Sequence, residues 1–568
     1  VEPAHQITAS SALGDALERL AYRQGYPGPL GSMDREAFLD ASAPYAPKGK
    51  GGPAKGDRLL GRVVKRTTDT VTVELIRDLT GTLRLEDNLW AGPYTEGRKS
   101  KSGGHTGVTV NPRLKDMKKA FSPGDIVYVE VLRREGARID LELVPIPMME
   151  GSLVSYPVIS GGVDTLVGGW DFDRNQTRRY LSDTRQVAST MKPIYYSLRY
   201  DQGMPPSTDL SGASFSGHGY DGHGKGKERI IAWESLLRSR DTSSQRVWSA
   251  ALRAACQGAR PEDGCNPEDK YRDWAKRMGF DDVERLLEAW GNEALGGNSQ
   301  SPLAMARAYG TLAARGRAPR MPLVRKITDR EGRVLERNIQ PLDPHASFAE
   351  TLTALWDITL EPKDEKIPKN EPRALGRRPI QQISPVTAFL TMANLVEVIK
   401  RGTGKRFRRP LANAKRGPIE LVTKRLNREA AGKTGTLDYD VWFDGFTYDR
   451  TAVVWIGADN LERPLGSSRE KSGVTASNTA LPAWTDFMAD VHGDTPVQEM
   501  TEKHGEPLSQ QVGRIHVNPQ TGLVPTCDCP PRTPCTPADG VPIYVRADAA
   551  LDCELEEEEG DQISEDDL

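Results

Sequence analysis

Three consecutive segments in the C-terminal third, one of small residues and two apolar, constrain the fold more than any other part of the chain. They are AGKTGT at residues 431–436, VWF at residues 441–443 and TAVVWIG at residues 451–457, separated by short polar turns. Short runs of small or apolar residues between polar turns predict neighbouring strands of one sheet. Gly435 leaves space on the first strand for a substrate backbone to lie close to it. A lysine, a hydroxyl residue and a glycine in a row are common, so this strand predicts a site only together with other motifs.

The length and charge of the chain limit the number of domains and the classes of protein that it can belong to. At 568 residues it is too long for one ordinary core, and several domains are expected. A net charge of −3 argues against a nucleic-acid binder. No run of eighteen apolar residues exists, so no membrane-spanning helix is predicted. The sequence starts at Val1 and not at Met, so we expect a processed product or a fragment. We also expect a membrane anchor in the full-length protein, upstream of this sequence.

The N-terminal part predicts a helix, a linker and a small barrel. Apolar residues recur at helical spacing in residues 9–25, and we assign residues 1–55 to this helix and a linker rich in Pro, Gly and Lys. Five short strands within residues 56–147 predict an OB-like β-barrel. Tyr128 is the only aromatic residue on these strands, whereas nucleic-acid-binding barrels stack bases on aromatic side chains. A structural or protein-docking role is therefore expected for the barrel.

The remainder predicts one large domain and a tail. Residues 150–494 begin with a strand, continue through a long helical interior and end with the three strands described above. This order predicts an α+β domain with an antiparallel sheet and a helical subdomain. Residues 495–568 form a tail that contains Pro and Cys and ends in an acidic run, which we expect to be disordered.

The cysteines predict a disulfide and no metal site. Cys256 and Cys265 flank a polar loop, as a small disulfide would. Four others lie in the tail: Cys527, Cys529, Cys535 and Cys553. Tail disulfides or free thiols are favoured over a metal site, because these four have no nearby histidine and lack the usual ligand spacing. Two other possible metal ligands, His218 and His223, are interpreted as loop residues.

A possible nucleophile precedes the strands. Ser189-Thr190-Met191-Lys192 places a serine and a lysine three residues apart, on one face of a predicted helix. A serine needs a base to become a nucleophile, and a lysine can serve if burial or a neighbouring cation lowers its pKa. By itself this motif is more often an ordinary helix surface pair.

The order of the motifs is more specific than either motif alone. Ser-x-x-Lys on a helix, then a Ser-x-Asn element, then Lys-Thr-Gly on a strand is the active-site pattern of penicillin-binding proteins and serine β-lactamases. The flanking segments LVGGWDF, SPLAMARAYGTLAARG and ALPAWTDFM occur here in the order typical of class A penicillin-binding proteins. Over about residues 10–492 the chain resembles the linker and transpeptidase region of that class.

The resemblance implies roles for the residues that match. Ser189 would attack the D-Ala–D-Ala carbonyl with Lys192 as general base, and Lys433 would bind the substrate carboxylate. The strand residues Thr434, Gly435 and Thr436 would hold the substrate, and the backbone N–H groups of Ser189 and Thr436 would form the oxyanion hole.

The middle motif departs from the family pattern. The best match is Ser239-Arg240-Asp241, in which Asp241 replaces the usual asparagine. An ionised carboxylate only accepts hydrogen bonds, whereas an amide also donates. An ion pair of Asp241 with Lys192 would raise the pKa of the lysine and weaken it as a base. Ser243 or Ser244 could serve instead, or the domain could be impaired.

The function implied is that of a serine D,D-transpeptidase that cross-links peptidoglycan stem peptides and is acylated by β-lactams, with no cofactor. The alternatives are a D,D-carboxypeptidase or β-lactamase-type hydrolase, and a catalytically impaired scaffold for wall synthesis. The expected location is the periplasmic, extracytoplasmic face of the inner membrane. Cell-wall synthesis partners are expected to bind the OB-like barrel.

Overall fold

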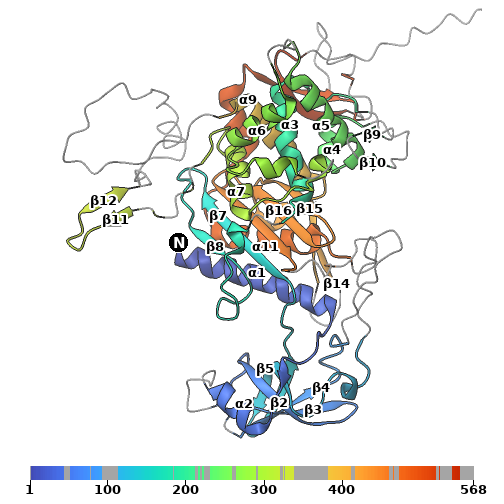
Figure 1. Ribbon diagram of the computed structural model, residues 1–568, viewed down its shortest axis with the longest axis vertical. Coiled ribbons are helices and arrows are strands. Elements are labelled where there is room, and N and C mark those ends of the chain that lie inside the picture. Colours follow the sequence, from blue (N-terminus) through green and yellow to red (C-terminus); the bar gives the residue numbers. More distant parts are fainter. Residues whose placement is uncertain are drawn as a thin grey trace, which may run out of the picture.

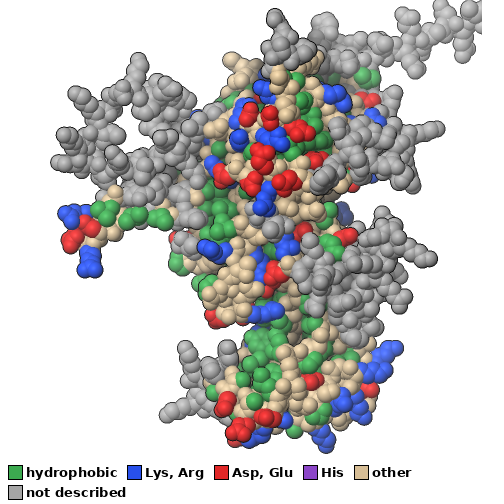
Figure 2. Space-filling model, in the orientation of Figure 1, with side chains coloured by type: hydrophobic (Ala, Val, Ile, Leu, Met, Phe, Trp, Pro, Cys, Tyr) green, Lys and Arg blue, Asp and Glu red, His purple; other side chains and the backbone are tan. Residues whose placement is uncertain are grey.

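The computed structural model has a small β-barrel below a larger α+β body (Figure 1). It describes residues 2–43, 52–76, 78–92, 113–182, 185–210, 215–217, 220–222, 230–258, 264–288, 292–319, 321, 324, 326–337, 382–410, 416–459, 465, 473–519, 523–524 and 540–549. Among these residues no helix is long and apolar enough to cross a membrane. On the face drawn in Figure 2, acidic and basic side chains are interspersed over the helical part of the body.

The barrel is a closed sheet of five strands. These are β2 (Arg58–Arg66), β3 (Thr70–Glu74), β4 (Thr80–Arg84), β5 (Asp125–Glu135) and β6 (Arg138–Leu143). The strand order is β5-β2-β3-β4-β6, and β6 pairs with β5 to close the ring. Alternate residues of each strand point inward, where Val63, Val73 and Leu141 are fully buried. The OB-like barrel predicted from the sequence is confirmed.

Short elements attach to this barrel. Strand β1 (Gly31–Ser32) pairs with β5, helix α2 (Arg35–Ser42) packs on β2, and a 3₁₀ turn, η2 (Met117–Lys119), precedes β5. The side chain of Asp34 caps α2 by accepting a hydrogen bond from the Ala37 N–H at 2.9 Å. Residues 31–42 therefore pack with the barrel, although the sequence predicted a linker there.

Helix α1 (Pro3–Gln24) packs on the body rather than serving as a free linker. Its buried residues Leu13, Leu17 and Leu20 repeat every three or four positions, which places them on one face. This face joins the core formed by the sheet of the body and helix α11 (Ala480–His492). The sequence predicted the helix but not the surface that it covers.

The body is built on a five-stranded antiparallel sheet. Its order is β15 (Ala431–Thr436), β16 (Asp440–Phe446), β17 (Arg450–Gly457), β7 (Glu150–Pro157) and β8 (Thr165–Val167). The three central strands are buried on both faces, since α1 and α11 cover one face and α7 (Pro302–Ala313) packs on the other. This is the mixed α+β architecture, with antiparallel sheet, that the sequence predicted.

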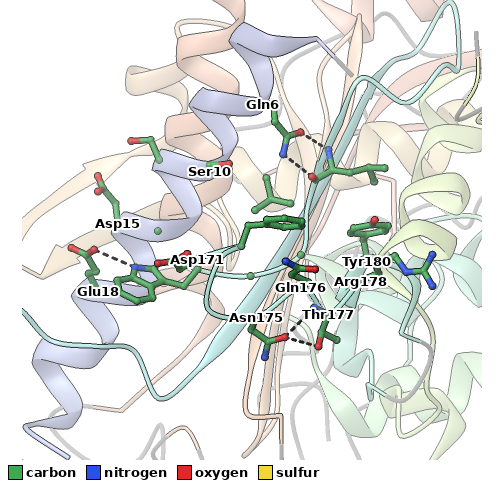
Figure 3. A pocket seen from close by; sticks show the side chains of 18 of the residues that line it. Gln6, Ser10, Asp15, Glu18, Asp171, Asn175, Gln176, Thr177, Arg178 and Tyr180 are labelled. Carbon is green, nitrogen blue, oxygen red and sulfur yellow. Dashed lines mark hydrogen bonds between the residues drawn. The ribbon is translucent and has the colours of Figure 1, made fainter. Parts of the chain in front are cut away.

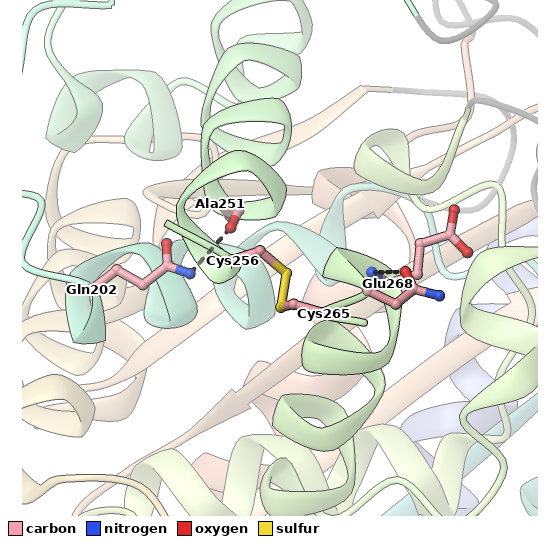
Figure 4. The surroundings of a disulfide bond; sticks show 6 residues. Gln202, Ala251, Cys256, Cys265 and Glu268 are labelled. Carbon is pink, nitrogen blue, oxygen red and sulfur yellow. Dashed lines mark hydrogen bonds between the residues drawn. A yellow bond between two sulfur atoms is a disulfide. The ribbon is translucent and has the colours of Figure 1, made fainter. Parts of the chain in front are cut away.

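The helical subdomain lies against one end of this sheet (Figure 1). Its helices are α3 (Lys192–Asp201), α4 (Ala232–Leu237), α5 (Asp241–Ala255), α6 (Pro267–Met278) and α9 (Pro385–Lys400). The smaller helical turns are η3 (Arg179–Leu181), η4 (Ala188–Met191), η6 (Glu284–Leu287), η7 (Glu293–Leu295), η8 (Ala476–Asn478) and α10 (Val422–Leu426). The predicted disulfide joins Cys256, after α5, to Cys265, before α6 (Figure 4).

The tail contains packed elements that the sequence did not predict. Helix α12 (Met500–Gly505) and turn η9 (Glu506–Leu508) precede a hairpin of β18 (Val512–Val517) and β19 (Val541–Arg546). The ring of Tyr544 meets that of Phe389 on α9 edge to face, with 5.0 Å between ring centroids. The four tail cysteines, the acidic run, His218 and His223 lie outside the described residues.

Three further hairpins complete the described structure. They are β9 (Phe215–Gly217) with β10 (Tyr220–Gly222), β11 (Lys326–Thr328) with β12 (Val334–Arg337), and β13 (Arg406–Pro410) with β14 (Arg416–Leu421). The second of these hairpins turns around Glu331-Gly332. It projects away from the body in Figure 1.

Candidate active site

Ser189 lies in a tightly held turn directly before α3. The turn is η4, and the preceding backbone is fixed where the Val187 N–H donates to Asn298 O and the Ala188 N–H donates to Gly296 O, at 3.1 and 2.9 Å. Ala188 has a φ of 53°, a conformation that a non-glycine residue adopts only when its surroundings impose it. The serine side chain is partly exposed at the body surface.

Lys192 begins α3 and is completely buried. Its Nζ donates to Asp241 Oδ1 at 2.7 Å, to Ser239 O at 3.0 Å and to Ser239 Oγ at 3.3 Å. Between the described residues Lys192 and Ser189 there is no side-chain hydrogen bond, although their spacing led us to expect one. The ammonium group is instead drawn toward the middle motif.

Burial outweighs the neighbouring carboxylate in setting the pKa of Lys192. Loss of solvent lowers the pKa, Asp241 raises it through its charge and its hydrogen bond, and the net direction is downward. The ion pair anticipated from the sequence is present, but it does not raise the pKa of the lysine above its ordinary value. Asp241 is itself about half exposed, which weakens its effect through solvent screening.

Ser239 occupies the middle of the site, between two lysines. It has a φ of 55° and lies in the turn between α4 and α5. Its Oγ accepts a hydrogen bond from Lys433 Nζ at 2.8 Å and lies 3.3 Å from Lys192 Nζ. The alternatives Ser243 and Ser244 are buried on α5, where they contact Ser235 and Tyr196 and neither lysine. The structure therefore brings Ser239 to the site and leaves the other two serines out of it.

Lys433 is also fully buried on β15. Its Nζ donates to Ser239 Oγ and, at 3.0 Å, to Thr434 O. Burial holds the pKa of Lys433 well below its ordinary value, and the nearby Lys192 lowers it further. The ammonium of Lys433 is turned toward Ser239, and its contact with a substrate carboxylate, which the resemblance implies, stays a prediction.

The hydroxyl residues of β15 line the outer part of the site. Thr434 Oγ1 lies 2.7 Å from Thr403 Oγ1, and Thr436, which is exposed, accepts a hydrogen bond from the Ala476 N–H at 3.0 Å. Strand β15 is at one edge of the sheet, so its outer backbone groups are open to an extended ligand.

Gly435 makes room for the nucleophile turn. A Cβ at this position would lie 2.9 Å from Val187 O, 3.0 Å from Thr190 Cγ2 and 3.2 Å from Ala188 Cβ. From the sequence we expected the missing side chain to accommodate a substrate backbone. In the structure, η4 fills that space, so the glycine sets the distance between Ser189 and β15.

Asp444 is a buried carboxyl that the sequence reasoning missed. It lies directly opposite Lys433 in the β15–β16 pair, and neither carboxyl oxygen has a hydrogen-bond partner among the described residues. Burial raises the pKa of Asp444 well above its usual range, and the charge of Lys433 only partly offsets this. An acidic residue inside the apolar run VWFDGF was the available signal.

The arrangement is suited to acyl transfer. A partly exposed serine lies three residues before a buried lysine of lowered pKa, and the hydroxyl of a second serine joins the ammonium group of this lysine to that of another buried lysine of lowered pKa. Such a site can activate a hydroxyl nucleophile and relay its proton. Within the described part of the chain, no group of three or more His, Cys, Asp or Glu residues is arranged to hold a metal ion.

Comparison with known proteins assigns this architecture to a family. The model of the penicillin-binding protein transpeptidase domain matches residues 156–481, which is more than half of the chain. This chain belongs to the penicillin-binding protein transpeptidase family. The matched range contains every residue of the site described above.

Individual relatives extend the match. Penicillin-binding protein 1A of Pseudomonas aeruginosa is 26% identical over 547 residues, covering 91% of this chain and 58% of the relative. The protein of the same name from Neisseria gonorrhoeae is 29% identical over 349 residues, covering 60% of this chain and 36% of the relative. The chain thus spans a little over half the length of the first and about a third of the second.

A solved structure shares the overall fold. The crystal structure of penicillin-binding protein 1A from Haemophilus influenzae superposes with a TM-score of 0.67 at 19% sequence identity, covering 98% of this chain and 72% of that one. The match includes both the barrel and the body of this penicillin-binding protein.

Proposed function

We propose that this penicillin-binding protein is a serine D,D-transpeptidase that cross-links peptidoglycan stem peptides. The observation that carries the proposal is the hydrogen-bonded group of Lys192, Ser239 and Lys433, which adjoins the turn that carries Ser189. Family membership supports the same reaction class.

Acylation begins when Ser189 Oγ attacks the carbonyl carbon of the penultimate D-Ala. Lys192, in its neutral form, takes the serine proton, directly or through Ser239 Oγ, which lies 3.3 Å from Nζ. The backbone N–H groups of Ser189 and Thr436 stabilise the oxyanion, at about 3 kcal/mol for each donor. The C–N bond then breaks, and the terminal D-Ala leaves with a proton on its amine.

Deacylation transfers the acyl group to an amine. An amino group of a second stem peptide attacks the ester carbon, gives a proton to the basic site and releases Ser189 as the hydroxyl. Thr434 and Thr436 hold the donor peptide along the edge of β15, and Lys433 orients Ser239 between the two lysines. A β-lactam would acylate the same serine and remain attached.

The Lys192–Asp241 ion pair supports one alternative. Because Lys192 Nζ bonds Asp241 at 2.7 Å and not Ser189, a non-catalytic wall-synthesis scaffold is the second candidate. A hydrolase that passes the acyl group to water is chemically close, since water and amine compete for the same ester. The lowered pKa of Lys192 favours an active site over the scaffold.

The expected setting is outside the cytoplasm. The Cys256–Cys265 disulfide supports an oxidising compartment, where peptidoglycan is assembled. The barrel, whose five described strands carry a single aromatic residue, Tyr128, serves in this proposal to dock other wall-synthesis proteins.

Turnover of a donor peptide tests the proposal. A stem peptide ending in D-Ala–D-Ala is incubated with the protein and an excess of an isotopically labelled D-amino acid, and the products are separated by mass. We expect the labelled amino acid to replace the terminal D-Ala, and Ser189→Ala to abolish the exchange. Release of D-Ala without exchange would identify a hydrolase, and no release by the unmodified protein would support the scaffold.

A further inference from the structure

A cavity of about 650 Å³ lies at the junction of the body and the barrel, away from Ser189. It is bounded by α1, by the loop that follows β8 and by Arg58 and Tyr128 of the barrel. Strands β8 and β15 are at opposite edges of the sheet, so about 19 Å of sheet separates this cavity from the catalytic strand. Its size and its place between two domains are those of a ligand site.

One wall of the cavity is a polar face of α1. Gln6, Ser10, Gly14 and Glu18 follow one another at intervals of four residues and therefore share one side of the helix. Figure 3 shows Gln6, Ser10 and Glu18 along this helix, across from the loop that carries Asn175, Gln176 and Tyr180.

The packing around Gly14 does not require a glycine at this position. A Cβ there would make only an ordinary contact, at 3.8 Å, with Trp170 Cδ1. Glycine is the least favourable residue inside a helix after proline, so alanine would be the better choice for stability. The absence of a side chain keeps the floor of the cavity open.

The walls are held together by Glu18. Its carboxylate accepts hydrogen bonds from Arg58 Nη1 and Nη2 at 2.6 and 3.0 Å, and from Trp170 Nε1 at 3.2 Å. These bonds connect the barrel, the helix and the loop around the same space. The cavity is thus a built feature of the domain junction.

The lining combines an exposed ring with free polar groups. Phe172, on the loop, is 72% exposed, although a phenyl ring normally avoids water. Among the described residues, the side chains of Ser10, Ser11 and Gln176 have no hydrogen-bond partner. A pyranose ring offers a C–H face that packs on an aromatic ring, and hydroxyl groups that bond amides and serines.

A peptide strand does not fit this edge of the sheet. Gln6 Nε2 donates to Leu166 O at 2.7 Å, and the Leu166 N–H donates to Gln6 Oε1 at 3.0 Å. The Glu2 N–H also donates to Asp164 O at 2.7 Å. These contacts occupy the free edge of β8, which a peptide would need in order to add as another strand.

We propose that this cavity binds a chain of β-linked pyranose sugars, of the kind that forms the glycan strands of peptidoglycan. The proposal rests on the proposed function, because glycan strands carry the stem peptides on which the site at Ser189 would act. A glycan chain bound at the β8 edge of the sheet would leave the β15 edge open to a stem peptide.

Titration with chitotetraose, a β-1,4-linked N-acetylglucosamine tetramer, tests the proposal by calorimetry or by NMR. We expect saturable binding at one site, and Phe172→Ala should weaken it about fivefold by removing the stacking ring. Gln176→Ala should weaken it about threefold by removing a hydrogen bond. The matched control is Leu335→Ala, which removes an apolar side chain that is 57% exposed from hairpin β11–β12 and should leave binding unchanged.

Gly14→Met guards against a loss of binding through misfolding. It introduces a good helix former without a backbone clash and fills the floor of the cavity, so it should reduce binding more than tenfold at an unchanged or higher melting temperature. Penicillin acylation is measured on the same samples and should be unaffected by all these variants, which separates this proposal from the proposed function. Three results would overturn the glycan-binding proposal. They are no saturable binding of chitotetraose, binding by Phe172→Ala and Gly14→Met that equals binding by the unmodified protein, and displacement of chitotetraose by a sugar-free stem pentapeptide.

Discussion

At the scale of residues, the site contains two buried lysines, and each has a carboxyl group near it that affects its pKa. Lys192 faces Asp241, and Lys433 lies opposite Asp444 in the neighbouring strand. Each lysine is buried, and burial dominates its pKa, so the carboxyl groups moderate the shift without reversing it. The protonation state of the site therefore depends on four groups that lie close together.

Removing the carboxylate beside Lys192 should accelerate acylation. Asp241 raises the pKa of Lys192, so Asp241→Asn should lower that pKa and increase the fraction of neutral lysine at pH 7. We expect acylation by benzylpenicillin to become about three- to tenfold faster near pH 7, with the midpoint of its rising pH profile moved to lower pH. Asp281→Asn, at an exposed carboxylate paired with Arg307, is the control. A slower reaction with an unmoved profile would show that Asp241 itself is needed.

Removing the unpaired carboxyl of Asp444 should stabilise the protein. Replacing a buried, unsatisfied polar group by an apolar one of similar shape removes a desolvation cost of about 1–3 kcal/mol. Asp444→Val should therefore raise the melting temperature by about 2–6 °C at pH 8.

The pH dependence of this gain has a definite sign. Folding raises the pKa of Asp444, so the native state binds more protons than the unfolded state, and its stability falls as pH rises from about 4 toward the raised value. The advantage of Asp444→Val should accordingly be larger at pH 8 than at pH 4. A variant that melts lower than the unmodified protein at both pH values would contradict this account of Asp444.

At the scale of elements, the site depends on how closely the nucleophile turn η4 approaches strand β15. The motif residues are far apart in sequence, and their alignment comes from Gly435 and Gly296, which leave space for Ala188 and its neighbours. A Cβ at Gly296 would lie 1.8 Å from Ala188 O. Gly435 and Gly296 thus each allow a neighbouring segment to pack closely against η4.

Adding one methyl group to β15 at this contact should impair acylation. Gly435→Ala places a Cβ 2.9 Å from Val187 O, so the turn that carries Ser189 must move. A displacement of this kind should slow acylation by about 100-fold, measured as the second-order rate constant with benzylpenicillin.

Gly432→Ala is the matched control on the same strand. Its Cβ would be equally crowded, at 2.7 Å from Phe443 Cζ and 2.9 Å from Asp444 O, but it does not approach the turn. It should reduce stability while acylation falls much less. Equal losses in the two variants would mean that the contact between β15 and η4 has no special role.

At the scale of the whole molecule, helix α1 joins the barrel to the catalytic body. It buries a leucine face against α11 and the sheet, and it bonds the barrel through Glu18 and Arg58. The barrel is therefore connected to the body through a packed element and not only through a flexible linker.

The packing of α1 should contribute directly to the stability of the body. Leu17→Ala removes a fully buried side chain and should reduce the free energy of unfolding by about 2–5 kcal/mol. Ile7→Ala, on the same helix but 70% exposed, should change it by less than about 0.5 kcal/mol. Thermal or denaturant unfolding measures both, and a Leu17→Ala protein as stable as the unmodified one would show that α1 is not part of the body.

Features that depend on residues close together in the sequence were predicted from it. Five short strands predicted the barrel, and the order of Ser189–Lys192 and Lys433–Thr436, together with the family resemblance, predicted the fold of the body. The sequence also predicted the Cys256–Cys265 disulfide, because the two cysteines are close in the chain.

Features that depend on contacts between distant segments could not be predicted. Strand β16 is buried on both faces, so alternation did not reveal that Asp444 lies opposite Lys433. The hairpin β18–β19 joins strands 23 residues apart and acquires its apolar partner only on α9. The sequence suggested that Lys192 could pair with Asp241, but the absence of a hydrogen bond from Lys192 to Ser189 among the described residues depends on how α3 packs against α5.

The central claim is that Ser189 is the nucleophile of an acyl-transfer site. The most direct measurement is the intact mass of the protein after incubation with benzylpenicillin, followed by mass-spectrometric mapping of the modified peptide. We predict one adduct with the mass of the intact penicillin, on Ser189, and no adduct on Ser189→Ala. A protein of unchanged mass, or an adduct that maps to Ser239 or any other residue, would contradict the account.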